Sequence, residues 1–225
     1  MSMVNSPLVE KVRNLGVQFL DNDVHIKGHD GATSILLPGE QTLWMFGDTI
    51  EIPVEELGQG KETRMPSNTA CIVPLQDLSN GIQHYSYFKT GNGEHPRQII
   101  PLFPDEDPVR KRLWAIHGVV HNGYIYLYYH EITLDMARPV FDTFKVNGMG
   151  IARGDLNTFQ FERLKAKDGT SQFWKNDQPG FGVFTEQIDQ YLYLWGSFAT
   201  GMHLSRVKPD NLEDSSAYEY LVQAP

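Results

Sequence analysis

IHGVVHNGYIYLYYHEI, residues 116–132, decides the fold class of this chain. Short runs rich in Val, Ile and Tyr flank Asn122-Gly123, a dipeptide that strongly favours a two-residue hairpin turn. We therefore expect two antiparallel strands here, joined by a tight turn.

The same layout occurs twice more, as HDGATSILLPGEQTLWMFGDT at 29–49 and FGVFTEQIDQYLYLWGS at 181–197. Each copy has a residue before a Gly, a small or β-branched residue, a polar turn and an apolar-aromatic strand. A second repeat relates GMGIARGDL (148–156) to GMHLSRVKP (201–209). Repeats that keep their order indicate a modular β architecture.

Two further strand candidates follow each hairpin. They are residues 69–76, 82–88, 149–156, 159–164, 202–207 and 217–222. Three units of four antiparallel strands predict an all-β fold, a β-propeller with about three four-stranded blades. A β-sandwich is the alternative, but sandwich strands do not repeat with register and order kept.

The domain plan follows from these units. We expect a lead-in segment at 1–20, in which residues 7–20 have helical spacing, and a propeller domain at 21–225. The expected blades cover residues 29–103, 112–164 and 178–222.

Composition narrows the function classes. The chain has 225 residues, with 19 Lys and Arg against 28 Asp and Glu, giving a net charge of −9 and no basic run. This balance argues against nucleic acid and an anionic membrane as partners. The first residues lack a signal-peptide pattern, which fits a cytoplasmic location for the chain as given. Polysaccharides, considered below as substrates, lie outside most cells, so the sequence leaves the location open.

Other chemistries have little support in the sequence. The single Cys71 excludes an intrachain disulfide and a Cys-based zinc cluster. No nucleotide-binding glycine motif or serine-hydrolase elbow is present. His25 and His29 have ligand spacing only on a helix, and their segment looks extended. We therefore expect no cofactor and no metal site.

Aligning the three hairpins predicts a cluster of acids. The position before the shared Gly holds Asp30 in the first copy and His117 in the second, and the strand-end position holds Asp48 and Glu131. Equivalent positions on successive blades converge on the propeller axis. We therefore expect the three acids to share one pocket, with His117 beside them. An Asp before Gly is also common in turns for local reasons.

Clustered carboxylates suit one reaction class in particular. Mutual repulsion raises the pKa of at least one acid, so one group is protonated while another is ionised. Glycoside hydrolysis needs that division, because one group protonates the leaving oxygen while the other activates water or attacks the sugar. We take Asp30, Asp48 and Glu131 as catalytic candidates. The expected substrate-binding side chains are His29, Arg64, Asn68, Trp114 and His117.

With these motifs in place, the chain resembles a family of bacterial five-bladed β-propellers, formerly of unknown function, that includes glycoside hydrolases of the endo-D-arabinanase type. The HDG and FGDT signatures carry the resemblance, which spans about residues 15–222. It implies a polysaccharide substrate, arabinan-like and furanosidic, and it matches Asp30 and Asp48 to acidic positions. Glu131 rests on the repeat alignment alone.

The number of blades bears on whether the protein is an enzyme or a binding protein. Five blades would need many more residues, so the chain is a fragment, a shortened homologue, half of a ring that a homo-oligomer completes, or a fold with a different strand count. A glycoside hydrolase is the favoured function. A carbohydrate-binding or assembly protein without hydrolysis is the alternative.

Overall fold

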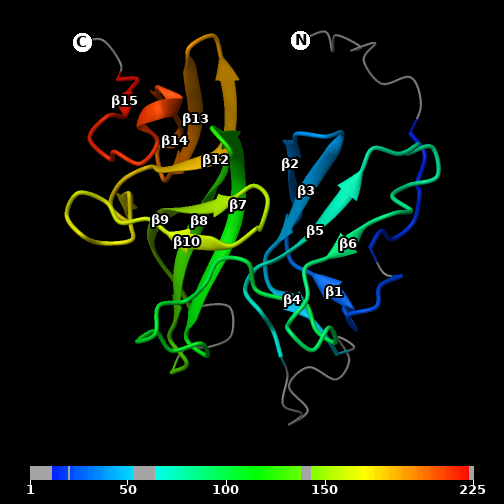
Figure 1. Ribbon diagram of the computed structural model, residues 1–225. Coiled ribbons are helices and arrows are strands. Elements are labelled where there is room, and N and C mark those ends of the chain that lie inside the picture. Colours follow the sequence, from blue (N-terminus) through cyan, green and yellow to red (C-terminus); the bar gives the residue numbers. More distant parts are fainter. Residues whose placement is uncertain (1–11, 20, 53–63, 138–142, 223–225) are drawn as a thin grey trace, which may run out of the picture.

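The computed structural model describes residues 12–19, 21–52, 64–137 and 143–222. Within these ranges the structure is all-β apart from one 3-10 turn, η3 (Pro209–Asn211). Its strands form three antiparallel sheets that follow one another along the chain, and a two-stranded pair beside the first sheet (Figure 1). No helix in the described part of the chain is long and apolar enough to span a membrane.

The first sheet has the order β2-β3-β5-β6. Its strands are β2 (Thr33–Leu37), β3 (Gln41–Phe46), β5 (Thr69–Pro74) and β6 (Ser86–Tyr87), and the adjacent pair is β1 (Gly28–His29) with β4 (Thr49–Ile50). The polar turn of the first repeat lies at Pro38-Gly39, between β2 and β3, and Gly39 there has a φ of 80°. That left-handed conformation favours glycine.

The second sheet has the order β7-β8-β9-β10, and β11 also pairs with β9. Its strands are β7 (Lys111–His121), β8 (Tyr124–Leu134), β9 (Phe144–Asp155), β10 (Phe161–Arg163) and β11 (Trp174–Lys175). Asn122 and Gly123 join β7 to β8 with φ values of 47° and 78°. Two successive positive φ values define the tight hairpin turn that the sequence predicts.

The third sheet has the order β12-β13-β14-β15. Its strands are β12 (Gly180–Ile188), β13 (Tyr191–Phe198), β14 (Gly201–Val207) and β15 (Glu219–Tyr220). All three predicted hairpins and the two strands after each of them are therefore present. The last strand of each sheet is shorter than its sequence segment suggested.

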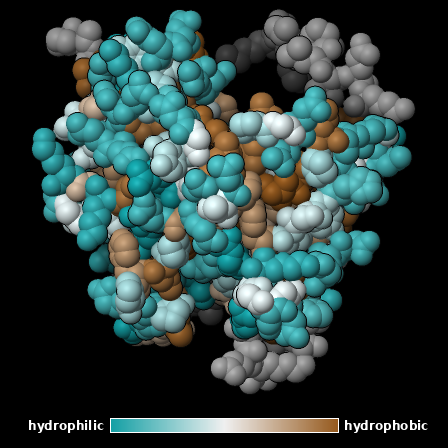
Figure 2. All heavy atoms as spheres, in the orientation of Figure 1, coloured by the Kyte–Doolittle hydropathy of each residue, from teal (hydrophilic) through white to brown (hydrophobic). Residues whose placement is uncertain are grey.

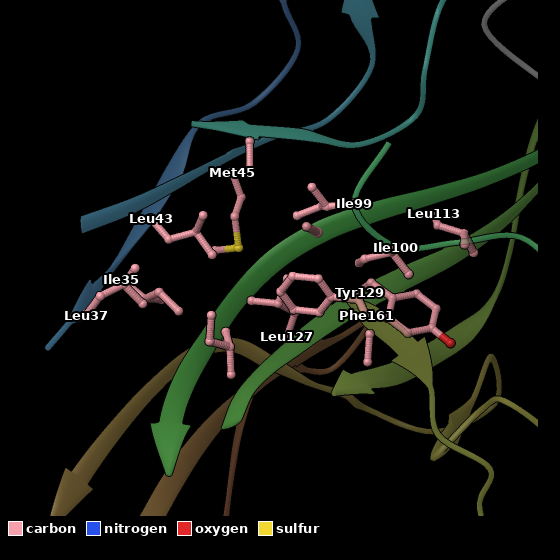
Figure 3. Close-up of a cluster of buried hydrophobic side chains, with 14 residues drawn as sticks. Ile35, Leu37, Leu43, Met45, Ile99, Ile100, Leu113, Leu127, Tyr129 and Phe161 are labelled. Carbon is pink, nitrogen blue, oxygen red and sulfur yellow. The ribbon is translucent and has the colours of Figure 1, made fainter. Parts of the chain in front are cut away.

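A hydrophobic cluster joins the first sheet to the second (Figure 3). Leu43 and Met45 of β3 point toward Leu127 and Tyr129 of β8, and all four side chains are fully buried. Burying one such side chain contributes roughly 1.5–3 kcal/mol. This cluster fixes the first sheet against the second and so sets the geometry of the site between them.

Two further clusters complete the core. Tyr128, Ile151 and Phe181 pack between the second and third sheets. Phe19 and Ile26 pack on the other face of the first sheet. Each of the first two sheets is thus covered on both faces.

The helical spacing of residues 7–20 does not produce a helix where the structure describes this segment. Residues 12–19 form no helix, and residues 7–11 and 20 lie outside the described ranges. Gly16 has a φ of 78° and its N–H donates to the Asn14 side chain at 2.8 Å, so a local turn replaces the helical hydrogen bond. Phe19 then supplies the buried contact of this segment.

Candidate active site

Backbone hydrogen bonds bring Asp30 and Asp48 together. Asp30 follows β1 and Asp48 precedes β4, and the Asp30 N–H donates to the Asp48 carbonyl oxygen at 2.8 Å. The Gly47 N–H donates to the Asp30 carbonyl oxygen at 2.7 Å. A Cβ at position 47 would lie 2.6 Å from that oxygen, so the close approach requires glycine. The FGDT segment thus holds the two aspartates opposite each other.

The Asp48 carboxylate faces the second sheet. Trp114 Nε1 donates to Asp48 Oδ1 at 3.2 Å, and Arg112 Nε lies 3.9 Å from the same oxygen. The Asp48 side chain is 13% exposed. Burial raises the pKa of Asp48; the charge of Arg112 and the Trp114 hydrogen bond oppose part of this rise, and the charge of Asp30 adds to it. Asp48 therefore holds a proton more readily than an Asp in water does.

Strand β7 supplies both partners of Asp48. Arg112 and Trp114 are two residues apart, so strand alternation puts them on one face. Arg112 Nη1 donates to the Met65 carbonyl oxygen at 3.0 Å, which fixes the guanidinium. Sequence reasoning missed Arg112. Its spacing from Trp114 in RLW was the signal that could have found it.

An open groove of about 280 Å³ lies between the first and second sheets. Residues 30–33 and Gly47 line one side, and Trp114, Ala115 and Ile116 line the other. The volume is close to the lower limit of small-molecule pockets, about 300 Å³. The groove therefore combines an exposed carboxylate, an aromatic wall and, bonded to that wall, a second carboxylate of raised pKa.

Glu131 lies in a different setting. In the β7–β8 register it is opposite Leu113, whereas Trp114 is opposite His130. Residues opposite each other in a ladder share a face and successive residues alternate, so Glu131 points to the other face of the second sheet from Trp114. The structure does not give Glu131 and Asp48 any common contact within the described residues.

The partners of Glu131 form a buried ionic cluster. Glu131 accepts hydrogen bonds from Lys111 Nζ at 2.5 Å, from Arg163 Nη2 at 2.7 Å and from Ser171 Oγ at 2.7 Å. Burial alone would raise the pKa of Glu131, but these donors outweigh it and the pKa is lowered. Glu106 completes the cluster through Arg163 and Lys111. This environment keeps Glu131 ionised.

The His29 side chain packs on the first sheet, against Phe46 of β3 and Tyr87 of β6. Its Nε2 is 2.7 Å from the Tyr87 hydroxyl, its Nδ1 is 3.3 Å from Thr49 Oγ1, and its ring stacks on Phe46 with centroids 3.9 Å apart. Burial lowers the pKa of His29 to about 4. Both ring nitrogens are thus engaged in packing β1 against the sheet.

His117 lies between the second and third sheets. Its Nδ1 is 3.0 Å from Thr185 Oγ1, and its ring lies 4.9 Å from that of Phe184, centroid to centroid. Burial lowers the pKa of His117. The structure thus gives it a partner on β12.

Asn68 and Arg64 also have partners within the protein. Asn68 is fully buried; its Oδ1 accepts from the Ile99 and Ile100 N–H groups at 2.9 and 2.7 Å, and its Nδ2 donates to the Leu113 carbonyl oxygen at 2.9 Å. Arg64 is half-exposed, with Nε 3.9 Å from Glu51 Oε1. Of the substrate-binding candidates, Trp114 is the one that lines the groove.

No group of three His, Cys, Asp or Glu side chains in the described residues is arranged to hold a metal ion. Asp30 and Trp114 line the groove, Trp114 donates a hydrogen bond to Asp48, and Arg112 Nε lies 3.9 Å from Asp48 Oδ1.

Three successive antiparallel sheets, with a groove that Asp30 and Trp114 line between two of them, define an all-β protein with a candidate site. The chain belongs to the family described as Domain of unknown function (DUF5005), whose model matches residues 17–224. No curated protein sequence matches it.

A solved structure shares the fold. A candidate hydrolase from Bacteroides ovatus superposes with a TM-score of 0.59 at 13% sequence identity. The match covers 91% of this chain and 56% of the other. This chain therefore spans little more than half the length of that structure.

Proposed function

We propose that this protein is a glycoside hydrolase acting on an arabinan-like, furanosidic polysaccharide or oligosaccharide, with Asp48 as the general acid and Asp30 as the base or nucleophile. The observation that carries the proposal is the pairing of a partly buried Asp48 of raised pKa with an exposed Asp30 beside one groove. Glycosidic cleavage needs one protonated and one ionised carboxyl group across the scissile bond.

The groove residues divide the steps between them. Asp48 gives its proton to the glycosidic oxygen as the bond to the leaving sugar breaks. The Asp48 carboxylate that remains is stabilised by the Trp114 indole N–H at 3.2 Å and the Arg112 charge at 3.9 Å. In one course, Asp30 takes a proton from a water that attacks the anomeric carbon, which gives inversion. In the other, Asp30 attacks that carbon and forms a glycosyl ester; the Asp48 carboxylate then takes a proton from a water that hydrolyses the ester, which gives retention.

A carbohydrate substrate is supported by the lining of the groove, whereas its arabinan-like, furanosidic type comes from the resemblance of the sequence. The groove is open and has an aromatic wall in Trp114, and aromatic faces pack on the apolar faces of sugar rings. An open groove accepts a chain that continues beyond the cleaved bond. The neighbour from Bacteroides ovatus, a candidate hydrolase, is compatible with this reaction class.

We also propose that the three sheets are blades of a β-propeller. Strands β2, β7 and β12 each begin a four-stranded meander, and β7 contacts both β2 and β12. First strands that lie next to one another are the arrangement that converges on a propeller axis.

The test is the release of reducing ends from D-arabinan, L-arabinan, xylan and galactan. Asp48→Asn keeps an acceptor for Trp114 but removes the transferable proton, so turnover should fall about 10²–10⁴-fold. Asp177→Asn, an exposed loop change in the third-sheet region, is the matched control and should keep full activity.

Two results would contradict the proposal. Full activity of Asp48→Asn would remove Asp48 from the reaction. Glycan binding that survives loss of both Asp30 and Asp48, with no cleavage of any of the four polymers, would instead favour a carbohydrate-binding protein.

A further inference from the structure

The second sheet contains an insertion that the third sheet lacks. In the third sheet a two-residue turn joins Phe198 of β13 to Gly201 of β14, and these two residues pair. The internal repeat makes Gly148 the equivalent of Gly201, and Gly148 pairs with Glu131 in the same way. Residues 132–147 lie between this second pair. Insertions into one copy of a repeat often lie on the binding face of a molecule.

The insertion begins beside the two residues that contact Asp48. Its first residue, Ile132, is directly opposite Arg112 in the β7–β8 ladder. Arg112 and Trp114 are two residues apart on β7, so they lie on the same face of the sheet as Ile132. Trp114 also lines the groove. The lengths that the insertion adds to β8 and β9 therefore start next to the candidate active site.

A β-bulge bends the added part of β9. The β8–β9 register shifts between Glu131 and Ile132, which leaves Asn147 as the extra residue. The Asn147 side chain donates a hydrogen bond to Thr133 Oγ1 at 2.7 Å, and this bond holds the bulge in place. Bulges bend a strand and change the direction of its side chains, and they are frequent next to active sites.

The bend brings Phe144 against Trp114. Phe144 pairs with Leu134, which lies four residues beyond His130, the residue opposite Trp114. In a flat sheet, a rise of about 3.3 Å per residue and a strand spacing of about 4.8 Å would separate the Cα atoms of Phe144 and Trp114 by about 16 Å. The ring centroids are nevertheless 5.5 Å apart, with the ring planes at 51°. The start of β9 therefore curls over the face that holds Trp114.

Phe144 continues the aromatic wall of the groove and is open to solvent. It is 45% exposed, and Val146 on the same face is 44% exposed. Phe144 is not among the residues that line the groove of about 280 Å³, so it adds aromatic surface just beyond that hollow. Aromatic faces pack on the apolar faces of sugar rings, so this surface can bind a further unit of a glycan chain.

We propose that Phe144 forms a second sugar-binding subsite beside Trp114 and gives the protein a preference for glycan chains over short glycosides. This inference rests on the proposed glycoside hydrolase function. A chain whose scissile bond lies beside Asp30 and Asp48 extends past Trp114, and a unit further along it reaches Phe144. Phe144 takes no part in the bond cleavage and determines which substrates bind well.

Kinetics on oligosaccharides of two to eight units, prepared from D-arabinan, L-arabinan, xylan and galactan, test the proposal. Phe144→Ala should lower kcat/KM for the longest substrate about three- to tenfold relative to the shortest one that is cleaved, through KM rather than kcat. Phe144→Tyr keeps an aromatic face and should retain the wild-type preference for long chains. Phe184→Ala is the matched control, because Phe184 is 46% exposed and lies on β12 of the third sheet.

Two results would overturn the subsite and leave the hydrolase proposal intact. One is an unchanged preference for long chains in Phe144→Ala. The other is an equal loss at every chain length, because Phe144 would then act only by supporting Trp114. Circular dichroism and urea unfolding establish that each variant is folded.

Failure of the proposed function gives a different result, in which the wild type cleaves none of the oligosaccharides. Isothermal titration calorimetry with the same oligosaccharides then tests the subsite by itself. Phe144→Ala should bind the longest chain about three- to tenfold more weakly than the wild type does. Equal binding by the two proteins, or no binding by the wild type, would overturn the subsite as well.

Discussion

Exchange of Glu131 for Gln separates a structural role for this carboxylate from a catalytic one. Arg163 has a side chain that is 0% exposed, and its Nη2 donates to Glu131 Oε2 at 2.7 Å. Lys111, which is 15% exposed, donates to the other carboxylate oxygen at 2.5 Å. The variant leaves two buried cations with Glu106 as their remaining carboxylate partner in this cluster.

The magnitude follows from that loss. Removing one partner of a buried ion pair costs about 3–5 kcal/mol, because an uncompensated charge stays in the interior. For a chain of this size each kcal/mol corresponds to about 2–4 °C in Tm, so we expect a drop of about 6–20 °C. Glu162→Gln is the control: Glu162 is 62% exposed and pairs with Arg153, so its loss should cost less than about 1 kcal/mol.

The assay is urea unfolding followed by tryptophan fluorescence, repeated from pH 7 to pH 3. The folded-state pKa of Glu131 is lowered from 4.5, so its contribution is present above pH 4.5 and is lost as the pH falls through the lowered value. The gap between wild type and Glu131→Gln should therefore shrink below about pH 4.5. A cost below about 1 kcal/mol at pH 7 would refute the reasoning, as would loss of turnover without loss of stability.

Three further predictions test other parts of the structure. Trp114→Phe removes a hydrogen bond that lowers the pKa of Asp48, so the alkaline limb of the pH–rate profile, where Asp48 loses its proton, should move to higher pH; an unmoved limb would show that Asp48 is not the acid. Asn68→Ala leaves the buried N–H groups of Ile99 and Ile100 without an acceptor, which should lower the free energy of unfolding by about 1–3 kcal/mol for each group. Urea unfolding measures this loss, and Asn80→Ala, at an exposed position, is the control. Gly182→Ala puts a Cβ on Tyr128 at a φ of 102° and should lower Tm by several degrees in calorimetry, whereas Gly91→Ala, with open space around it, should not.

The hairpins could be predicted from the sequence because their signals are local. Asn122-Gly123 and Pro38-Gly39 specify turns by backbone conformation, and alternating apolar residues specify which face of each strand is buried. The apolar spacing at residues 7–20 does not give a helix at residues 12–19, and the cause is again a local backbone conformation. Gly16 adopts a left-handed conformation there, and apolar spacing alone does not reveal that.

The candidate site could be predicted only in part. Asp30 and Asp48 meet because they flank β1 and β4, two short strands that pair and that the sequence analysis did not predict. Glu131 lies on the opposite face of the second sheet from Trp114, because successive residues of a strand point to opposite faces. An alignment of strand ends does not determine which face a residue takes. Arg112 could have been found from its spacing to Trp114, but the partners of Asn68 come from segments far from it in the sequence, and no local pattern joins them.

Asn68 also has a consequence for how the chain folds. One amide ties Ile99, Ile100 and Leu113 together, so residues 31 to 45 positions away along the chain must be in place before its hydrogen bonds form. Closing such loops costs chain entropy early and returns stability only when both sheets are assembled. The first and second sheets should therefore unfold as a single cooperative unit, with amide hydrogens of β5 and β7 giving one common free energy of opening in hydrogen exchange.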